Sequence, residues 1–551
     1  MSALLLVFFA ACGTGILLSL ALPAARQGNV LAWLGCLAAL AATAAGAGAL
    51  ASGEVFIRTL WSVPGLSALT LRLDALSAAF VLVTGLVLFP ASIYASSELR
   101  RDPPGERARA FTVMMLALYA SIILILIAGD ALLFLLAWEV MSILCYLLVL
   151  SGASGEDNPA GSGYLLLAMG EAGTLAAALG FLLLGRNASS LEFDALKSAA
   201  PALDANVRWG VFLLTFLGFG VKAGLVPVNS WLQRAYAAAP RAFAPVLAGA
   251  TLNLGLYGIL RVNADLMPAA PTEAGLIVLV AGTVSALIGI LYATTDNDLK
   301  AMLAHSSIEN VGIIVAGFGA GMVFVGERHP ALAAIAFVAA LYHMINHSLY
   351  KALLFFGVGA VEARAGTRDM DRLGGLIRWM PLTAAGFLAG SLAIAALPPF
   401  NGFVSEWLTL QALLRSAELS ETGTKLVFAL CGASLALTAA LAVTCFVKAF
   451  AMSFLGMPRL DETQRVTEAA PAALASMAIA ALLCLAFGVL PTYVISMLNP
   501  ASAQMTGASA ADALVPPFFA SDAAHASLPA AFAGEFHDLG AQVGQELLPG
   551  R

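Results

Sequence analysis

The sequence predicts an all-α polytopic membrane protein with about fourteen transmembrane helices, and three observations support this fold class. The chain has 551 residues, of which 60% are hydrophobic and only 11% are charged. Its mean hydropathy is +0.90, which exceeds what the core of a soluble globular protein requires. The apolar runs are long and continuous, and neither an open sheet edge nor an irregular loop can face lipid, so the spans are helices.

Windows of about 20 residues place these helices in order along the chain. The first range carries no positive charge at its start and has a long apolar stretch, so we interpret it as a span and not as a cleaved signal peptide. The range 424–454 is long enough to be tilted or bent. The fourteen predicted ranges are 3–23, 29–51, 74–97, 110–128, 130–150, 161–185, 207–228, 242–264, 273–293, 300–324, 331–359, 380–409, 424–454 and 466–492.

The distribution of arginines predicts the orientation. With the N-terminus outside, the cytoplasmic loops are 24–28, 98–109, 151–160, 229–241, 294–299, 360–379 and 455–465. Most arginines between spans fall in these loops, and the outer loops carry only scattered bases, which is the positive-inside pattern. We therefore expect a multi-pass protein of a bacterial-type inner membrane with both termini extracytoplasmic.

Two of the predicted spans are interrupted. Residues 218–227 read GFGVKAGLVP, with a break expected near 222–228, and residues 397–402 read LPPFNG. Proline breaks the helical hydrogen-bond ladder, and such breaks at membrane depth are tolerated where they line a polar cavity. In transporters, discontinuous helices at corresponding positions of two halves point to an ion site.

The two breaks predict two inverted five-helix repeats, because each follows a charged residue in the middle of an earlier span. The predicted units are three N-terminal helices, a first repeat, a linking ninth helix, a second repeat, a C-terminal helix and an extracytoplasmic tail. Their limits are 1–109, 110–264, 265–299, 300–455, 456–499 and 500–551. The tail is rich in alanine, proline and polar residues, and we expect it to lie on the outer face, at most as a short amphipathic helix.

Ionisable residues recur in the middle of the predicted spans. A charge at bilayer depth costs at least about 2.5 kcal/mol, so it needs a partner, water or a function. A succession of acids and bases is typical of a relay for protons or small cations. The proposed carriers are Glu139, Lys222, His305, Glu309, His343, His347, Lys351 and Glu406.

Glu139 and Lys222 form the expected pair of the first half. A buried carboxyl and a buried ammonium compensate each other and can switch between an ion pair and a neutral pair. The alternatives are a structural hydrogen bond for Glu139 and a Lys222 side chain that extends to the cytoplasmic face. Glu171 is an additional acid among glycines, for which a structural and a relay role are nearly balanced.

His343, His347 and Lys351 are spaced i, i+4, i+8 and share one helical stripe. They can pass a proton along the membrane plane, with Glu406 handing protons to the outside water. A zinc site and a purely structural polar stripe are the alternatives. His305 and Glu309, also i, i+4, are expected to bridge the two halves.

The sequence lacks the signals of catalytic, cofactor, metal and nucleic-acid sites. The cysteines lie scattered in apolar segments without metal-ligand spacing, there is no glycine-rich nucleotide motif, and no basic cluster is interleaved with aromatics. We therefore expect no catalytic residue, no cofactor, no metal and no nucleic-acid partner, and lipid as the surroundings.

The motifs around these residues resemble the antiporter-like subunits of respiratory complex I, Mrp-type cation/proton antiporters and membrane-bound hydrogenases. The resemblance covers about 110–455 and is greatest to component B of hydrogenase-4 and formate hydrogenlyase. It implies that Glu139, Lys222, Lys351 with its two histidines, and Glu406 carry protons. The stretches that carry it are LLAWEVMSILCYLLV, AHSSIENVGIIVAG, LYHMINHSLYKALLFFGVGAV and LPPFNGFVSEWL.

One stretch departs from the family pattern. Asn229 and Tyr236 stand where the resemblance leads us to expect histidines, and Asn253 stands where it leads us to expect a lysine. Asparagine cannot carry a proton as a cation, and at best it orders a water. The first half-channel is therefore expected to be altered or closed, or re-routed through Glu171 and Arg241.

The resemblance implies a proton-translocating subunit of a redox-driven membrane complex. Its expected partners are other membrane subunits and a peripheral arm with iron–sulfur or nickel–iron centres. The alternatives are an Mrp-type cation/proton antiporter subunit, the proton-conducting partner of a zinc protein for inorganic-carbon uptake, and a scaffold with an inactive channel, for which Asn253 is the argument.

Overall fold

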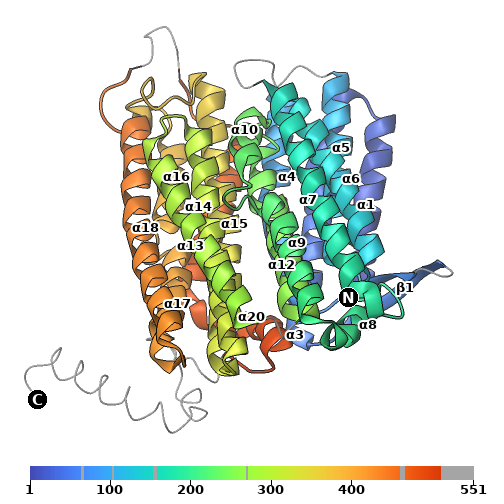
Figure 1. Ribbon diagram of the computed structural model, residues 1–551. Coiled ribbons are helices and arrows are strands. Elements are labelled where there is room, and N and C mark those ends of the chain that lie inside the picture. Colours follow the sequence, from blue (N-terminus) through green and yellow to red (C-terminus); the bar gives the residue numbers. More distant parts are fainter. Residues whose placement is uncertain (64–66, 102–104, 153–157, 268–270, 460–465, 511–551) are drawn as a thin grey trace, which may run out of the picture.

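The computed structural model describes residues 1–63, 67–101, 105–152, 158–267, 271–459 and 466–510. In this part of the chain the helices stand side by side as one bundle (Figure 1). Twelve of the described helices are long and apolar enough to cross a membrane.

Ten of the twelve are single helices or a helix with a short extension, and two are composite. The ten are α1 (Ser2–Ala21), α4 (Ala75–Arg101), α5 (Glu106–Leu126), α6 (Ala131–Leu150), α7 (Pro159–Leu184), α13 (Thr272–Thr295), α14 (Leu299–Gly326), α15 (Pro330–Ala365), α18 (Thr422–Phe454) and α19 (Pro471–Val489). The composite spans are η1 (Ala24–Arg26), α2 (Gln27–Val30), η2 (Leu31–Gly35) and α3 (Cys36–Ser52), and then α11 (Ala244–Val246), η5 (Leu247–Thr251), α12 (Asn253–Leu260) and η6 (Arg261–Leu266).

Shorter helices occupy the other two predicted spans. α9 (Ala205–Ala223) covers most of 207–228, and α16 (Pro381–Ile394) with α17 (Asn401–Leu414) covers 380–409. The helical membrane fold is thus confirmed, whereas the count of fourteen spans, the inverted repeats and the domain limits stay predictions. The remaining short elements are η3 (Gly185–Asn187), α8 (Phe193–Ala199), η4 (Ala200–Ala202), α10 (Ser230–Ala238), η7 (Leu376–Arg378) and η8 (Arg415–Glu418).

Both predicted breaks are present. α9 ends at Ala223, and Gly224 follows with φ +75°, a left-handed conformation that glycine adopts without a Cβ penalty. A Cβ there would also lie 2.4 Å from the side chain of Leu232. The Trp231 indole of α10 donates to the Val221 carbonyl at 2.7 Å, which satisfies a backbone acceptor near the broken end. The second break separates α16 from α17 and contains Pro398 and Pro399.

Two wide helical turns that the sequence did not predict flank α12. The π segments η5 and η6 lie directly before and after it and are completely buried. Such turns interrupt the regular ladder and are frequent at functional sites. They place Asn253 at one end of α12 and Arg261 at the other.

A stripe of glycines brings α13 and α14 into close contact. Gly275, Gly282 and Gly289 are spaced by seven, and a Cβ on any of them would meet the α14 backbone within 2.7 Å. Small residues at this spacing let two helix backbones approach closely in a membrane. The neighbour of Gly289 is Glu309, so this contact fixes the position of a buried acid.

The two ends of the bundle differ. One end, which we name the α10 face, carries α10, and the opposite end, the hairpin face, carries the N-terminus, α8, α20 (Pro491–Thr506) and a β-hairpin (Figure 1). The hairpin consists of antiparallel strands β1 (Phe56–Val63) and β2 (Ser67–Leu73). The helical fold class holds, and this hairpin is a small addition that the sequence analysis did not predict: two strands with aromatic and β-branched residues pair with each other between two spans.

The predicted tail begins inside a packed helix. α20 runs through position 500, where Pro500 lies within the helix, and it packs against α15 and α4. Ser502 donates to the Ala334 carbonyl at 3.0 Å, and Gln504 donates to Asp74 at 3.1 Å. Residues 500–506 are therefore part of a packed helix at the hairpin face, because these polar groups pair with buried groups of the bundle. The outer location of the tail stays a prediction. Residues 511–551 lie outside the described part of the chain.

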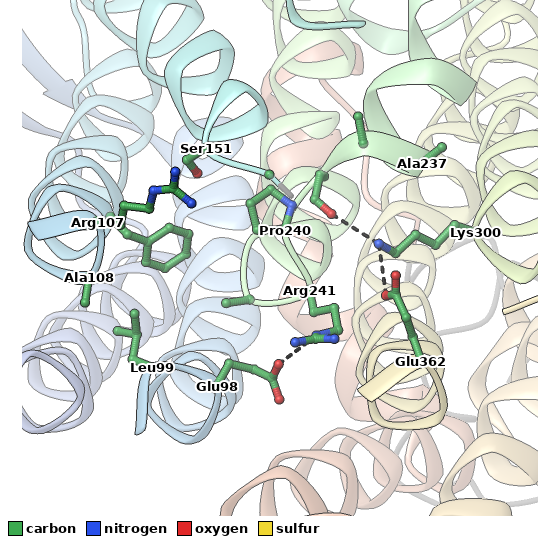
Figure 2. A pocket seen from close by; sticks show the side chains of 15 residues that line it. Glu98, Leu99, Arg107, Ala108, Ser151, Ala237, Pro240, Arg241, Lys300 and Glu362 are labelled. Atoms are coloured by element: carbon green, nitrogen blue, oxygen red, sulfur yellow. Dashed lines mark hydrogen bonds and ion pairs between the residues drawn. The ribbon is translucent and has the colours of Figure 1, made fainter. Parts of the chain in front are cut away.

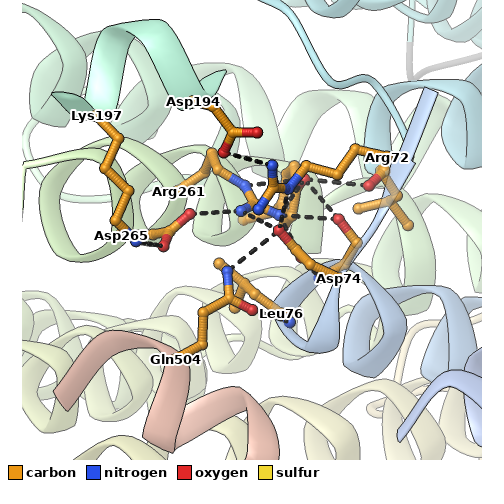
Figure 3. A network of polar contacts seen from close by, with 11 residues as sticks. Arg72, Asp74, Leu76, Asp194, Lys197, Arg261, Asp265 and Gln504 are labelled. Atoms are coloured by element: carbon orange, nitrogen blue, oxygen red, sulfur yellow. Dashed lines mark hydrogen bonds and ion pairs between the residues drawn. The ribbon is translucent and has the colours of Figure 1, made fainter. Parts of the chain in front are cut away.

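A buried ion-pair network closes the hairpin face (Figure 3). Arg261 donates two parallel hydrogen bonds to the carboxylate of Asp74, both at 2.8 Å, and a third to Asp265 at 2.6 Å. Ser77 and Tyr257 accept further bonds from its guanidinium. The paired fork geometry is the strongest arrangement available to arginine and carboxylate. We call these five residues the Arg261 network.

Candidate functional site

The expected histidine–lysine stripe lies on α15 and is buried along its length. His343, His347 and Lys351 have 0% exposure. The Lys351 ammonium donates to Ser306 Oγ at 2.5 Å and to the Leu303 carbonyl at 2.9 Å, both on α14. A single hydroxyl and a single carbonyl thus hold an ammonium at membrane depth, with no carboxylate within 4 Å among the described residues.

Asn310 joins the two ends of the stripe. Its Oδ1 accepts from the Tyr350 hydroxyl and lies 3.2 Å from His343 Nε2. Its Nδ2 donates to the Ser306 carbonyl at 2.7 Å and to Glu309 Oε2 at 3.3 Å. One uncharged amide therefore connects a histidine, a tyrosine and a buried acid.

The contacts of His343 identify its hydrogen-bonding pattern. Its Nε2 lies 3.2 Å from Asn310 Oδ1, and its Nδ1 lies 2.9 Å from the Ser405 hydroxyl, which also donates to the Gly402 carbonyl at 3.1 Å. The single hydroxyl proton of Ser405 can serve only one of these two acceptors at a time. Asn346 also donates to Ser405, at 2.9 Å, and to the Asn401 carbonyl at 2.8 Å. The network thus extends from α14 through α15 to α17.

Two carboxyls adjoin this network. Glu309 on α14 is buried and is an electrostatic neighbour of Lys351 and of Glu406. Glu406 follows Ser405 on α17 and is only partly buried. We name Lys351, Ser306, Glu309, Asn310, Tyr350, His343, Ser405 and Glu406 the second-half network.

Several buried polar atoms beside the network have no partner in the described protein. They include both ring nitrogens of His347, Oδ1 of Asn346, and both side-chain polar atoms of Asn401. Buried polar groups are nearly always hydrogen-bonded, and those without a protein partner are where ordered water binds. The chain therefore provides water sites next to its titratable groups.

The first half pairs two acids instead of an acid and a base. Glu139 on α6 has Glu171 on α7 and Thr174 as its neighbours. Two adjacent carboxylates at membrane depth repel each other, so the pair is stabilised when one of them holds a proton. The expected pair of Glu139 with Lys222 is absent from the ion pairs of the described residues, so that expectation was wrong for this state of the molecule.

Lys222 lies in the last turn of α9 and is buried rather than extended to the surface. Its ammonium stands 5.8 Å from the centre of the Trp231 ring, a cation–π contact within the usual range. Its electrostatic neighbour on α6 is Cys145. The alternative of a lysine that reaches the cytoplasmic face is thereby contradicted.

Asn253 connects the two halves directly. Its Nδ2 donates to the Gly249 carbonyl at 3.0 Å and to Ser348 Oγ on α15 at 2.7 Å, while its Oδ1 has no partner. Ser348 is the neighbour of His347 in the chain. The position expected to hold a lysine is thus a fully buried amide junction with one free acceptor.

Two expected residues lie elsewhere. His305 does not bridge the halves with Glu309. Its Nδ1 lies 2.5 Å from Asp296, and its ring is 5.4 Å from that of Tyr292. The helical spacing of His305 and Glu309 was correctly inferred, but the His305 imidazole contacts Asp296, a partly exposed carboxylate at the end of α13, and not Glu309. Arg241 lies at the α10 face and forms an ion pair with Glu98 at 2.8 Å.

Sequence reasoning missed the uncharged members of the second-half network. A search for charges at membrane depth overlooks Asn310, Tyr350, Ser306 and Ser405, although all four directly adjoin predicted residues in the chain. It also missed Lys300, whose ammonium is 3.1 Å from Glu362, because both residues lie at span ends. The positions of polar residues at helical spacing from Lys351 were the available signal.

One known family matches the part of the chain that contains this site. The family described as NADH:quinone oxidoreductase/Mrp antiporter, TM, matches residues 128–433, which is more than half of the chain. The chain belongs to this family. The matched range contains all eight proposed carriers, and the resemblance inferred from the motifs is confirmed.

Relatives within this antiporter family are similar over most of the chain. Hydrogenase-4 component B of Escherichia coli (strain K12) is 38% identical over 418 residues, which cover 76% of this chain and 62% of the relative. Formate hydrogenlyase subunit 3 of the same organism is 34% identical, covering 70% of this chain and 61% of the relative. The chain therefore spans a little less than two thirds of both relatives.

The fold of the family is also found in solved structures. The structure of the Mrp complex from Dietzia sp. DQ12-45-1b contains a chain that superposes with a TM-score of 0.77 at 21% identity, covering 92% of this chain and 97% of that one. At this identity the likeness concerns the fold alone.

Proposed function

We propose that this protein is a proton-translocating membrane subunit of a redox-driven complex, and that its second-half network moves the protons. The observation that carries the proposal is a group of buried polar contacts across α14, α15 and α17. Lys351 bonds the Ser306 hydroxyl, Asn310 bonds the Ser306 carbonyl and His343, and His343 contacts Ser405 beside Glu406. An ammonium held only by uncharged groups is suited to transfer rather than to permanent pairing, because no carboxylate holds its proton in place.

The family favours this function over a scaffold with an inactive channel. Its described relatives are named as a hydrogenase component and a formate hydrogenlyase subunit. We infer that the chain works with other membrane subunits and a peripheral arm that carries iron–sulfur or nickel–iron centres. The redox chemistry takes place in that arm, and proton transfer takes place in this chain.

The proposed location is a bacterial-type inner membrane with the α10 face in the cytoplasm. The loops at the α10 face carry the arginines, and the N-terminus and α20 share the opposite end (Figure 1). Both ends of the described chain are then extracytoplasmic.

The test is potential-driven proton flux through the complex purified by a tag on this chain and reconstituted in liposomes. A potassium diffusion potential drives the flux, and a pH-sensitive dye inside the liposomes reports it. Lys351→Ala and Glu406→Gln are each expected to lower the flux at least about tenfold, the scale of a lost proton-transfer group. Lys425→Ala, at a partly exposed lysine near the start of α18 and outside the second-half network, is the matched control and retains it. Wild-type flux in both test variants contradicts the proposal.

A second candidate is a subunit of an Mrp-type cation/proton antiporter, which the family description itself includes. The composition of the same purified complex distinguishes the two. Iron–sulfur or nickel–iron subunits support the redox-driven complex, and small antiporter subunits together with sodium- or potassium-dependent flux support the antiporter. A zinc protein as the main partner would instead support the role in inorganic-carbon uptake.

A further inference from the structure

A cavity of about 440 Å³ opens at the α10 face, between the two halves of the chain (Figure 2). Its walls come from the ends of α4, α5, α6 and α10 and from the starts or ends of α14 and α15. Five charged side chains line it: Glu98, Arg107, Arg241, Lys300 and Glu362. A polar cavity of this size is large enough for water.

The charges in the cavity are arranged in pairs. Arg241 holds Glu98 at 2.8 Å, and Lys300 is 3.1 Å from Glu362 and donates to the Ala239 carbonyl at 3.2 Å. Burial alone would lower the pKa of Arg241, but the carboxylates of Glu98 and Glu362 outweigh it and raise that pKa. Arg241 is therefore a fixed positive charge that does not release its proton, and Lys300 with Glu362 forms a second ion pair in the cavity.

Tyr236 lies between this cavity and the second-half network. It directly precedes Ala237, Ala238 and Ala239, which form one wall of the cavity. Its ring packs on Phe355 with centroids 5.4 Å apart, and the hydroxyl is fully buried. That hydroxyl faces Ser307 on α14 but makes no regular hydrogen bond.

Ser307 lies close to both Tyr236 and Lys351. The Ser307 hydroxyl and the Lys351 ammonium donate to the same acceptor, the Leu303 carbonyl, at 3.0 Å and 2.9 Å. On the other side, Tyr236 is an electrostatic neighbour of Cys145, which in turn neighbours Lys222. Tyr236 thus lies between the lysines of the two halves, where Asn253 offers no proton-carrying group.

The distance along α14 from Lys300, in the cavity wall, to Ser307 is short. Lys300 and Ser307 are seven residues apart on α14, hence on one face and separated by about 10 Å along the helix axis. The long Lys300 side chain and a small number of waters span that distance. A hydroxyl can accept a proton on one side and release its own on the other, so the tyrosine is unchanged after each transfer.

We propose that this cavity is the inlet through which protons from the α10 face reach Lys351, and that Tyr236 carries them over the last step through Ser307. The proposal rests on the proposed function, because it requires that Lys351 transfers protons. It also explains how a chain with asparagine at position 253 feeds its second half.

The test compares Tyr236→Phe with Tyr119→Phe in the flux assay on the reconstituted complex. Both substitutions remove one buried hydroxyl and keep the ring, but Tyr119 bonds Ser92 on α4, away from the cavity. Tyr236→Phe is expected to lower the flux about tenfold with unchanged assembly of the complex, and Tyr119→Phe leaves the flux unchanged. Wild-type flux in Tyr236→Phe overturns the inlet.

A rescue variant separates proton transfer from a structural role. Tyr236→His introduces a proton-carrying ring and is expected to recover at least half of the flux lost in Tyr236→Phe. If His and Phe variants lose flux equally, the hydroxyl acts only through structure and the proposal is wrong. If Lys351→Ala also conducts like the wild type, the proposed function itself fails, a result distinct from failure of the inlet alone.

Water access to the cavity is tested independently. Ala108 lines the cavity, and Ala108→Cys is expected to react with a membrane-impermeant maleimide added from the side of the α10 face. Cys445, which is fully buried on α18, provides the unreactive reference in the same chain. Protection of Ala108→Cys from the reagent on that side overturns the inlet.

Discussion

At the scale of single residues, the chain places uncharged groups next to ionisable ones. Lys351 is held by Ser306 and a carbonyl, and His343 is held by Asn310 and Ser405. Hydroxyls and amides stabilise a buried charge without fixing it, because each can turn between donating and accepting or be replaced by water. A carboxylate in direct contact would instead hold the ammonium permanently.

The paired acids of the first half give a prediction at this scale. Glu139 and Glu171 are neighbouring acids at membrane depth, and because two adjacent negative charges repel each other we expect them to share one proton. We expect the infrared band of a protonated carboxyl to disappear in both Glu139→Gln and Glu171→Gln, since either change removes the shared acid proton. Glu192→Gln, at a loop residue outside this pair, leaves the band in place and serves as the control. A band that survives in both single variants would contradict the shared proton.

At the scale of elements, helix breaks and wide turns decide where polar groups lie. The break after α9 turns Trp231 and Tyr236 inward on α10, and the π segments around α12 place Asn253 at the centre and Arg261 at the hairpin face. The Arg261 network then ties α12 to the start of α4. Removing one partner of a buried ion pair leaves an uncompensated charge, which is far more costly than losing a surface pair.

Asp74→Asn is expected to lower the stability by about 3–5 kcal/mol, because it leaves Arg261 without its two-bond partner. Asp194→Asn is the matched control: Asp194 pairs with Arg72 in the same region, but its side chain is 65% exposed, against 1% for Asp74. Its loss is expected to cost less than about 1 kcal/mol. Unfolding midpoints of the purified protein in detergent measure both, and equal effects would contradict the argument.

The same pair makes stability depend on pH. Burial alone would raise the pKa of Asp74, but the guanidinium of Arg261, with its hydrogen bonds and the Ser77 amide, lowers that pKa below its usual value. A lowered pKa contributes stability above the unfolded value of about 4, and this contribution is lost as the pH falls through and below that value. The unfolding midpoint of Asp74→Asn is therefore expected to fall less on acidification than that of the wild type.

At the scale of the whole molecule, two opposite faces have different chemistry. The α10 face carries arginine-rich loops and the charged cavity, whereas the hairpin face is closed by the Arg261 network, β1–β2 and α20 (Figures 1 to 3). In the described part of the chain, an open polar cavity on one side and a buried ion-pair network on the other make the two ends of the bundle chemically different. The partly buried Glu406 marks the side of the second-half network away from Lys351.

The difference between the two faces predicts which engineered cysteine a membrane-impermeant reagent reaches from outside the cell. In intact cells, Ser62→Cys on the hairpin is expected to react with a membrane-impermeant maleimide, whereas Arg372→Cys in the loop between α15 and α16 reacts only after the membrane is opened. Inverted membrane vesicles give the opposite result. Reaction of Arg372→Cys in intact cells would place the α10 face outside and overturn the proposed orientation.

Much of the site follows from sequence because buried charge is rare and therefore visible. The spans, both breaks and the α15 stripe were predicted from hydropathy, proline and helical spacing. The contacts of those residues were not predicted. Glu139 lies beside Glu171 instead of Lys222, and His305 contacts Asp296 instead of bridging the two halves. The spacing of residues along a helix determines which face of the helix their side chains occupy. The residue that each side chain contacts depends on which neighbouring helix packs against that face.

The sequence alone determined that the chain is a bundle of membrane helices with titratable groups at bilayer depth, since a long apolar run has only one stable form in lipid. The tertiary structure decided how those groups connect. Serine, asparagine and tyrosine carry no hydropathy signal of their own, yet Ser306, Asn310, Ser405 and Tyr236 link the charges because helix packing brings them within hydrogen-bond reach. The charged cavity at the α10 face likewise exists only where the ends of six helices meet.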